Sequence, residues 1–266
     1  MRYPSIAAAA ALVAALGSGR AAAQTLAQRV SGAGDGRVQL RFASRPGVCG
    51  DGRGLISTGD HDIMRANWST GDAANWPRAC APGPVRVVMS TSHGDVDRLR
   101  VSIGGNDSDA TVHDLGTVSA PEAADYLLGL ARTASNSVGD DAVLAAVLAD
   151  STTPWPSLLT LARDARSEDA RQGAAFWLGR AAAASVNGTP LFGDSDAPAE
   201  TSDEEVRGQA IFALSQQPHN ESVPVLIQVA RTNADPVLRS KALFWLSQSG
   251  DDRAIDLFGQ ILHVER

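Results

Sequence analysis

The spacing of apolar residues changes near residue 118. Over residues 38–118, apolar and polar residues alternate in short runs such as "VQLRFAS" and "VRVVMS", which is typical of half-buried β-strands. The runs "VRVVMS" and "DRLRVSIGG" are separated by "TSHGD", so we predict a hairpin with His93 at its tip. The sequence between the other runs is rich in Gly, Pro, Asp and Asn, which predicts β structure with many loops.

After residue 118, alanine and leucine dominate and the apolar spacing becomes helical. Ser119 is the expected N-cap of the first helix, with Glu122 at the capping-box position. Further helices are predicted at residues 139–149, 154–165, 168–182, 203–216, 222–232, 236–248 and 252–263. We therefore predict an α+β protein, with a small β-rich domain over residues 24–118 and an all-α solenoid over residues 119–266.

The helical half contains a repeated phrase with a period of roughly 30–40 residues, which is typical of solenoid repeats. The shared positions are Arg171, Ala174, Phe176 and Leu178; Arg207, Ala210, Phe212 and Leu214; and Arg239, Ala242, Phe244 and Leu246. We expect the alanines to allow close helix approach and the aromatic rings to fill the space between stacked units. The arginines are expected to form a ladder between repeats. A globular bundle and an aromatic ligand pocket are the alternatives.

The phrases "YLLGLARTA", "AAVLAD", "AAFWLGR", "IFALSQ" and "LFWLSQSGDDRAIDLFGQIL" resemble the HEAT repeat of exported bacterial proteins that carry a small N-terminal domain. The resemblance covers roughly residues 120–266 and implies a binding scaffold without an assigned catalytic residue. It is weaker over residues 38–118, where it depends on "GVCGDG" and "GPVRVV". An acidic run, "SVNGTPLFGDSDAPAETSD", replaces the expected second helix after "AAFWLGRAAAA", so residues 184–202 form either a helix or an open loop.

The N-terminal stretch "MRYPSIAAAAALVAALGSGRAAAQ" has the parts of a secretory signal peptide. Arg2 precedes an apolar segment that is too short to span a bilayer, and small residues precede a cleavage site after Ala23. We predict that residues 1–23 are a signal peptide and that the chain is exported, either to the periplasm or into the medium. A short hydrophobic anchor is the alternative. The alanine-rich leader and the single lysine, Lys241, are typical of a bacterial protein.

The two cysteines and the net charge limit the covalent links and the partners that the chain is expected to have. Cys49 and Cys80 are the only cysteines, and in an exported protein such a pair predicts one disulfide. Two free thiols or half of a metal site are the alternatives. The net charge of −7 disfavours nucleic acid and anionic lipid as partners. No segment after the leader is apolar enough for membrane insertion of the mature chain.

Sequence motifs for phosphate binding, zinc hydrolysis, serine hydrolysis and calcium binding are missing from the chain. The main candidate metal- or ligand-binding residues lie in the β-rich part. Neighbouring residues on a strand point to opposite faces, so these side chains would not all converge on one ligand. We therefore interpret them as solvated loop residues. The weak metal-ligand candidates are Asp60, His61, Asp62 and His93, and the possible glycan-binding residues are Trp68 and Trp76.

These observations predict a non-catalytic, exported scaffold that binds another protein through its solenoid. We expect no cofactor and no catalytic residue. One alternative is a metal- or glycan-binding module in the β-rich domain. The other is a chromophore-handling lyase, because HEAT-like phycobilin lyases use the same repeat; export and a disulfide that leaves no free cysteine both weigh against it.

Overall fold

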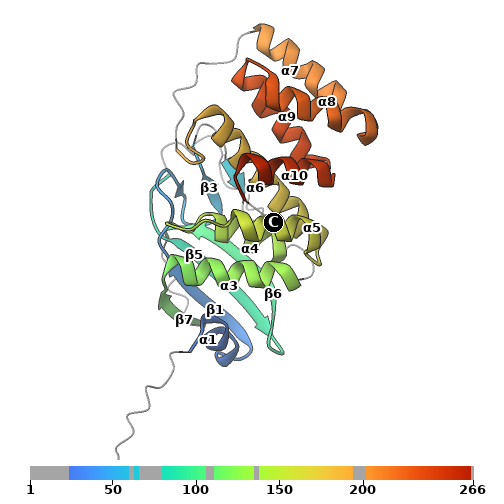
Figure 1. Ribbon diagram of the computed structural model, residues 1–266. Coiled ribbons are helices and arrows are strands. Elements are labelled where there is room, and N and C mark those ends of the chain that lie inside the picture. The colour runs from blue at the N-terminus through green and yellow to red at the C-terminus, as the bar shows by residue number, and fades with distance from the viewer. Residues whose placement is uncertain are drawn as a thin grey trace, which may run out of the picture.

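The structure is a computed structural model that describes residues 24–59, 63–65, 80–105, 111–134, 138–193 and 202–264. It confirms the α+β class, with a β region at the N-terminal side and a stack of helices after it (Figure 1). The expected signal peptide, residues 1–23, lies outside the described residues. In the part of the chain that is described, no helix is long and apolar enough to cross a membrane.

The strands form two sheets. Their bounds are Gly36–Phe42 (β1), Cys49–Gly50 (β2), Leu55–Ser57 (β3), Ile63–Arg65 (β4), Val85–Ser92 (β5), Asp95–Ile103 (β6) and Val112–Thr117 (β7). The larger sheet has the order β6-β5-β1-β7, with β1 antiparallel to β5 and parallel to β7. The smaller sheet has the order β2-β3-β4. The predicted hairpin joins β5 and β6 through His93 and Gly94, whose positive φ values of 52° and 86° suit a two-residue hairpin turn.

The alternation seen in the sequence creates the buried face of the larger sheet. Val38, Leu40 and Phe42 of β1 are fully buried, as are Val87 and Met89 of β5. Helices α3 and α4 lie over the sheet in the foreground of Figure 1, and the N-terminal helix α1 (Leu26–Gly32) lies near its lower end. One continuous cluster of buried side chains extends from this sheet into the helical stack.

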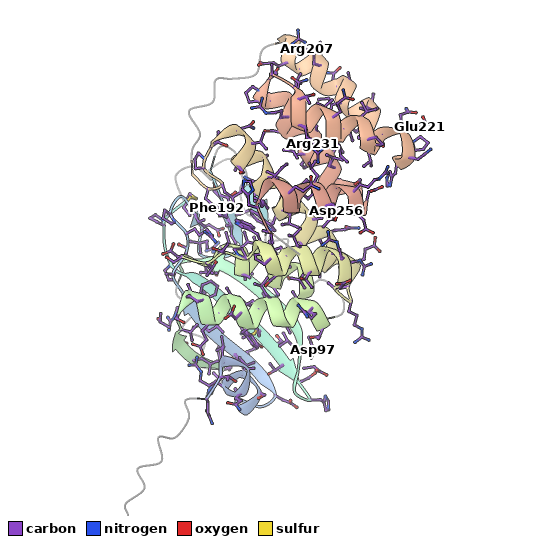
Figure 2. All side chains as sticks on the ribbon, in the orientation of Figure 1. Asp97, Phe192, Arg207, Glu221, Arg231 and Asp256 are labelled. Carbon is purple, nitrogen blue, oxygen red and sulfur yellow. A yellow bond between two sulfur atoms is a disulfide. The ribbon has the colours of Figure 1, made fainter. Side chains whose placement is uncertain are left out.

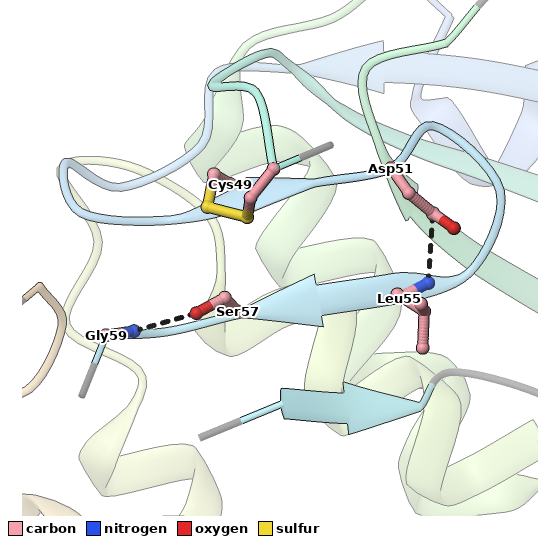
Figure 3. Close-up of a disulfide and its surroundings, with 6 residues drawn as sticks. Cys49, Asp51, Leu55, Ser57 and Gly59 are labelled. Atoms are coloured by element: carbon pink, nitrogen blue, oxygen red, sulfur yellow. Dashed lines mark hydrogen bonds between the residues drawn. A yellow bond between two sulfur atoms is a disulfide. The ribbon is translucent and has the colours of Figure 1, made fainter. Parts of the chain in front are cut away.

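The disulfide predicted between Cys49 and Cys80 is confirmed, with their Cα atoms 5.3 Å apart (Figure 3). It ties β2 to the segment that leads into β5. The carboxylate of Asp51 accepts hydrogen bonds from the backbone N–H groups of Gly54 and Leu55, at 2.9 and 3.0 Å, and so closes the turn between β2 and β3. A small sheet with little core is therefore held by one covalent bond and a tight turn.

The helices follow the predicted pattern closely. They are Ala120–Thr133 (α3), Val138–Val147 (α4), Trp155–Asp164 (α5), Glu168–Asn187 (α6), Ser202–Ser215 (α7), His219–Thr232 (α8), Pro236–Gln248 (α9) and Asp252–Ile261 (α10). Ser119 caps α3 by accepting from the Glu122 N–H, as its position in the sequence indicates. The short helix α1, which the alternating pattern did not predict, begins with a capping box between Thr25 and Gln28.

The helices do not stack in sequence order. α6 packs against α9, and α9 in turn packs against α7, so α9 lies between its two repeat neighbours. α10 similarly lies between α5 and α8. Figure 1 shows the result: α7 and α8 form the free end of the stack, whereas α10 and the C-terminal end lie beside α5 and α6.

The relative directions of α6, α7 and α9 explain why α9, and not α7, packs against α6. Asn187, at the end of α6, donates to the Pro236 carbonyl and the Ser240 hydroxyl at the start of α9, at 3.2 and 2.7 Å. α6 and α9 are therefore antiparallel. The Phe212 ring of α7 lies 5.0 Å from the Trp245 ring of α9, at corresponding depths of two parallel helices. The unit α7–α10 is thus an ordinary pair of helical hairpins that docks on α5 and α6 in the reverse orientation.

Two of the three repeated arginines, Arg171 and Arg239, bind carbonyl groups at the end of the preceding helix, and Arg239 also donates to the Asn187 side chain of α6 at 2.7 Å. Arg239 donates to the Asn233 and Ala234 carbonyls at 2.9 and 3.0 Å, just past the end of α8. Arg171 donates in the same way to the Ala165 carbonyl past the end of α5, at 2.7 Å. Each arginine therefore satisfies carbonyl groups that the preceding helix leaves without partners. Because α6 and α9 run in opposite directions, the two guanidinium groups belong to separate helix ends.

Candidate functional site: an aromatic groove between α6 and α9

Large apolar side chains remain at the surface of the repeat region. Among the described residues, the exposed large hydrophobic side chains are Val206, Phe212, Val225 and Phe244. Phe212 and Phe244 are 48 and 43% exposed, so the expectation that they fill the space between units is wrong. The helical period explains the difference, because α9 buries Leu238, Ala242 and Leu246 along one face and turns Phe244 away from it.

The expectation that aromatic rings fill the space between units holds for Trp177, which is buried, and in part for Trp245, which is half-buried. Trp177 is 2% exposed, and the Phe176 ring lies edge-on to it at a centroid distance of 5.4 Å. The Phe244 ring lies edge-on to Trp245 at 5.0 Å. Edge-to-face contacts of this kind fix the ring orientation. The exposed Phe244 ring is therefore held by Trp245, which follows it in α9, and the exposed Phe212 ring of α7 contacts the same tryptophan at 5.0 Å.

A groove of about 350 Å³ runs between α6 and α9. Phe176 and Phe244 come from equivalent repeat positions and lie on the two opposing helices. The remaining lining residues are Gly179, Arg180, Ala183, Ala184, Thr189, Pro190, Leu191, Ser240 and Ser247. Because the two helices are antiparallel, the same repeat position supplies one aromatic ring from each side of the groove.

The floor of the groove depends on small residues. A Cβ at Gly179 would lie only 2.7 Å from the Ser247 Cβ, so a glycine is needed where α6 crosses α9. Ala183 and Ala184 continue this small-residue surface along α6. Close approach of the two backbones leaves an open channel above them, between the aromatic rings.

One wall of the groove is the segment that follows α6. Gly188 is the C-cap of α6 and ends the helix in the left-handed conformation, with φ of 67°. The chain then turns to the disulfide-bonded region, where the Gly193 N–H donates to the Thr58 carbonyl at 2.9 Å. A Cβ at Gly47 would lie 2.6 Å from the Gly193 nitrogen, so the close approach of the two backbone segments requires a glycine at position 47.

Phe192 anchors the same wall. Figure 2 labels Phe192 near the boundary between the helical stack and the β region. Its ring lies 5.9 Å from the Trp177 ring and 5.7 Å from the guanidinium carbon of Arg45. Arg45 is itself fixed, since its Nε donates to the Val147 carbonyl and its Nη2 to the Thr152 carbonyl, at 2.8 and 2.5 Å. Burial lowers the pKa of Arg45, an effect that the nearby Asp150 carboxylate opposes. The β region thereby holds a wall of a groove that lies on the helical stack.

Arg180 is the one charged residue among those that line the groove. Its guanidinium carbon lies 6.0 Å from the Phe176 ring centroid and 5.6 Å from that of Trp177, within the range of a cation–π contact. The cations of α9 lie outside the groove lining, since Arg239 donates to Asn187 and Lys241 lies beside Gly208 of α7. The groove combines apolar walls with a local positive charge in an otherwise acidic chain.

A second and larger cavity, of about 700 Å³, lies between α5 and α10. Its charged side chains pair with one another, since Arg163 contacts Asp256 at 2.7 Å. Next to it, Arg231 of α8 donates to Gln260 of α10 at 2.5 Å. These contacts join helices that are distant in the sequence, and we assign this cavity to the packing of the reversed unit.

The residues that the sequence singled out for chemistry are placed as follows. Asp60, His61, Asp62, Trp68 and Trp76 lie outside the described residues, so their candidate roles stay predictions. His93 is exposed at the hairpin tip. Within the described ranges there is no group of three or more His, Cys, Asp or Glu side chains that could hold a metal ion.

The sequence did not single out Arg180, Pro190 or Leu191. The shared position of Phe176 and Phe244 was the available signal, but the aromatic rings were assigned to the interior. Stacking in sequence order would also have placed Phe176 beside Phe212, whereas the reversed unit brings Phe244 to that place.

Comparison with known proteins gives one match. The family model for HEAT repeats matches residues 198–266, which contain the reversed unit α7–α10. Comparisons with curated proteins and with solved structures found no match. Residues 198–266 are thus similar to HEAT repeats, in a HEAT-like helical region that follows a small β region, and HEAT repeats generally act as protein-interaction scaffolds.

Proposed function

We propose that this chain is an exported, non-catalytic scaffold that binds another protein through the aromatic surface of α6, α9 and α7. One observation carries the proposal. Three helices place phenylalanine at the same repeat position, and two of these rings, Phe212 and Phe244, remain 48 and 43% exposed. Exposed aromatic rings that are fixed by packing are typical of residues that dominate protein interfaces.

The composition of the groove supports binding rather than catalysis. Its lining offers aromatic rings, aliphatic groups, hydroxyls and one guanidinium group. A nucleophile beside a base, or a pair of carboxyl groups, is the arrangement that hydrolytic or transfer chemistry requires, and the lining residues include neither. The HEAT repeat family is also generally non-catalytic.

The proposed export follows from the leader and from the disulfide. Residues 1–23 have the composition of a signal peptide, and the disulfide between Cys49 and Cys80 is a bond that persists in oxidising compartments. Protein collected from the periplasm or medium of a native host should begin at Gln24. N-terminal sequencing that finds Met1 in the located protein would contradict export by cleavage.

The binding role is tested by retention of a partner from the native host. Full-length mature protein, Phe244→Ala and Val225→Ala are immobilised and exposed to the same extract. Val225 is 44% exposed on α8 and outside the lining of the groove, so its replacement is the matched control. We expect a partner that the wild type and Val225→Ala retain and that Phe244→Ala loses. Equal retention by all three proteins would contradict the proposed surface.

A further inference from the structure

We infer that the surface of α7 and α9 binds an extended segment of its protein partner through the backbone of that segment, with the carboxamides of Gln216 and Gln248 pairing with its peptide groups. The inference rests on the proposed function and specifies how the partner is recognised. It follows from a second repeat position that also stays exposed in both helices.

This second position comes four residues after the exposed phenylalanine. Gln216 follows Phe212, Gln248 follows Phe244, and both glutamines are exposed. Residues four apart in a helix lie on the same face, so each ring has a carboxamide beside it. The two parallel helices therefore present the same pair of an aromatic ring and a carboxamide.

The two carboxamides are oriented in the same way. Nε2 of Gln216 donates to the Ser215 hydroxyl at 3.2 Å, and that hydroxyl donates to the Phe212 carbonyl at 2.7 Å. Gln248 and Ser247 repeat this arrangement, at 3.3 and 2.7 Å. In the described part of the chain, the carboxamide oxygen and the second N–H of each glutamine have no hydrogen-bond partner. Each glutamine thus keeps one acceptor and one donor for a ligand.

Both carboxamides line one pocket of about 220 Å³ between α7, α8 and α9. Its walls include Leu226, which is 1% exposed, and the half-buried Trp245. The Trp245 ring is itself held by the Phe212 and Phe244 rings, each at 5.0 Å. The pocket is smaller than the roughly 300–1,000 Å³ of small-molecule sites, so it suits one side chain of a larger partner.

A carboxamide matches the backbone of an extended chain. In a β-strand the N–H and C=O of one residue point to the same side, and residues two apart, roughly 6.4–6.8 Å along the strand, repeat that direction. A glutamine with a free acceptor and a free donor can pair with both groups of one such residue. Because both glutamines line one pocket, two residues of the same strand come within their reach, and an adjacent side chain can enter the pocket.

Other kinds of partner surface leave the carboxamides unpaired. A helix uses its backbone N–H and C=O groups internally, except at its ends. A flat apolar surface offers neither donors nor acceptors, so it would cover both carboxamides at a cost in binding free energy. An extended segment is the partner that satisfies the phenylalanine rings and the glutamines together.

The test uses the full-length mature protein and the labelled peptide Gly-Thr-Leu-Thr-Leu-Thr-Gly, whose threonines favour the extended conformation. The comparison peptide has the same sequence and is N-methylated at its three central residues, which removes N–H donors in either register. Binding is followed by fluorescence polarisation. We expect the unmethylated peptide to bind at least about tenfold more tightly. Equal binding of the two peptides, or no binding of either at millimolar concentration, would overturn the inference.

Substitutions at the glutamines test the assigned groups. Gln216→Met and Gln248→Met remove a carboxamide and keep a long side chain that favours a helix. Each should weaken binding of the unmethylated peptide roughly threefold to tenfold. Gln209 is exposed on α7 and lies outside the pocket lining, so Gln209→Met is the matched control and should bind as the wild type does. Circular dichroism melting curves establish that the variants are folded, and unchanged binding in both pocket variants would overturn the inference.

The two proposals fail in different ways. If retention of the native partner depends on Phe244 but on neither Gln216 nor Gln248, the scaffold function stands and recognition through the backbone is wrong. If partner retention does not depend on Phe244 either, the proposed surface is wrong and the inference fails with it.

Discussion

Helices α7 and α9 contain the same repeated phrase and occupy different environments. In α9 the repeat alanine, Ala242, and the repeat leucine, Leu246, are 0 and 1% exposed. In α7 the equivalent Ala210 is exposed and Leu214 is only partly buried. α9 is covered on two sides, by α6 and by α7, whereas α7 packs on α9 and α8 at the free end of the stack.

This difference shows that a repeat residue acquires its role from its neighbours. In a solenoid each unit contacts mainly the adjacent units, so a terminal helix has half of the partners of an internal one. The phenylalanine of the phrase behaves differently, since Phe212 and Phe244 are exposed in both helices. A side chain that stays exposed both in the terminal helix α7 and in the internal helix α9 is better explained by a role in binding than by a role in packing.

The largest effect is expected from shortening the repeat leucine. Leu246→Ala removes a fully buried side chain and should lower the free energy of unfolding by about 2–5 kcal/mol. Leu214→Ala removes a partly exposed side chain and should lower it by less than half as much. Urea denaturation of both variants measures the difference. Equal losses would mean that α7 is packed as deeply as α9.

Enlarging the repeat alanine should give a smaller contrast. Ala242→Met adds volume to a closed contact between helices and should cost about 1–3 kcal/mol. Ala210→Met adds the same atoms at an exposed position and should change stability by no more than about 0.5 kcal/mol. Both residues favour helices, so propensity is nearly matched. Thermal melting of the pair distinguishes a free α7 from one that is covered by a further element.

The contact between α4 and α6, at the opposite end of the stack, should respond to pH. Burial and the charge of Asp140 raise the pKa of Asp141 to about 7. The unfolded chain releases this proton near its ordinary pKa of 3.8, whereas the folded chain retains it until about pH 7. The free energy of unfolding should therefore fall as pH rises through this window and level off above it.

Burial and the charge of Asp169 also raise the pKa of Asp140, to about 6, so both carboxyl groups contribute to the slope. Asp141→Asn should remove the larger part of that slope, leave a shallower one from Asp140, and make the protein more stable than the wild type at pH 8. Asp125→Asn, at an exposed position of α3, is the control. Melting temperatures from pH 4 to pH 8 are the measurement. A wild-type curve that rises across this range would contradict the assigned sign.

Only a modest effect on stability is expected at the shared exposed position of Phe212 and Phe244. Phe212→Ala and Phe244→Ala each remove a ring that is already near half exposed, so each should cost well below the ~3–5 kcal/mol of a buried phenylalanine. Partner retention should nevertheless fall in Phe244→Ala. A large loss of stability in either variant would indicate that the ring contributes to packing, and it would count against the proposed binding surface.

The sequence predicted local structure well, because local signals are contained in a few adjacent residues. Ser119 marked a helix start through a side chain that accepts a backbone N–H group, and this cap is present. The cysteine pair predicted the disulfide, because no other cysteine competes for either partner. The helix α1 was missed because it is a short segment with one turn of buried residues, Leu26 and Val30.

Only some residues of the candidate site could be predicted from the sequence. Its phenylalanines could be recognised from the repeat, but the repeat period does not state which face of the helix meets a neighbour. Arg180 and Leu191 had no signal of their own, because they belong to the groove only through the approach of α9 and the turn after Gly188. A residue whose role arises from a contact across the chain leaves no local pattern.

The amino-acid sequence by itself determined the α+β class, the approximate positions of the helices after residue 118, the repeat and the covalent closure of the β region. These features follow from side-chain periodicity, capping and cysteine count, which act over a few residues. Only the tertiary structure decided that α7–α10 docks in reverse, that α7 is the free end and that a groove opens between α6 and α9. The physical reason is that identical repeat faces can pack in either direction, so the choice depends on contacts such as Gly179 with Ser247 and Asn187 with Ser240.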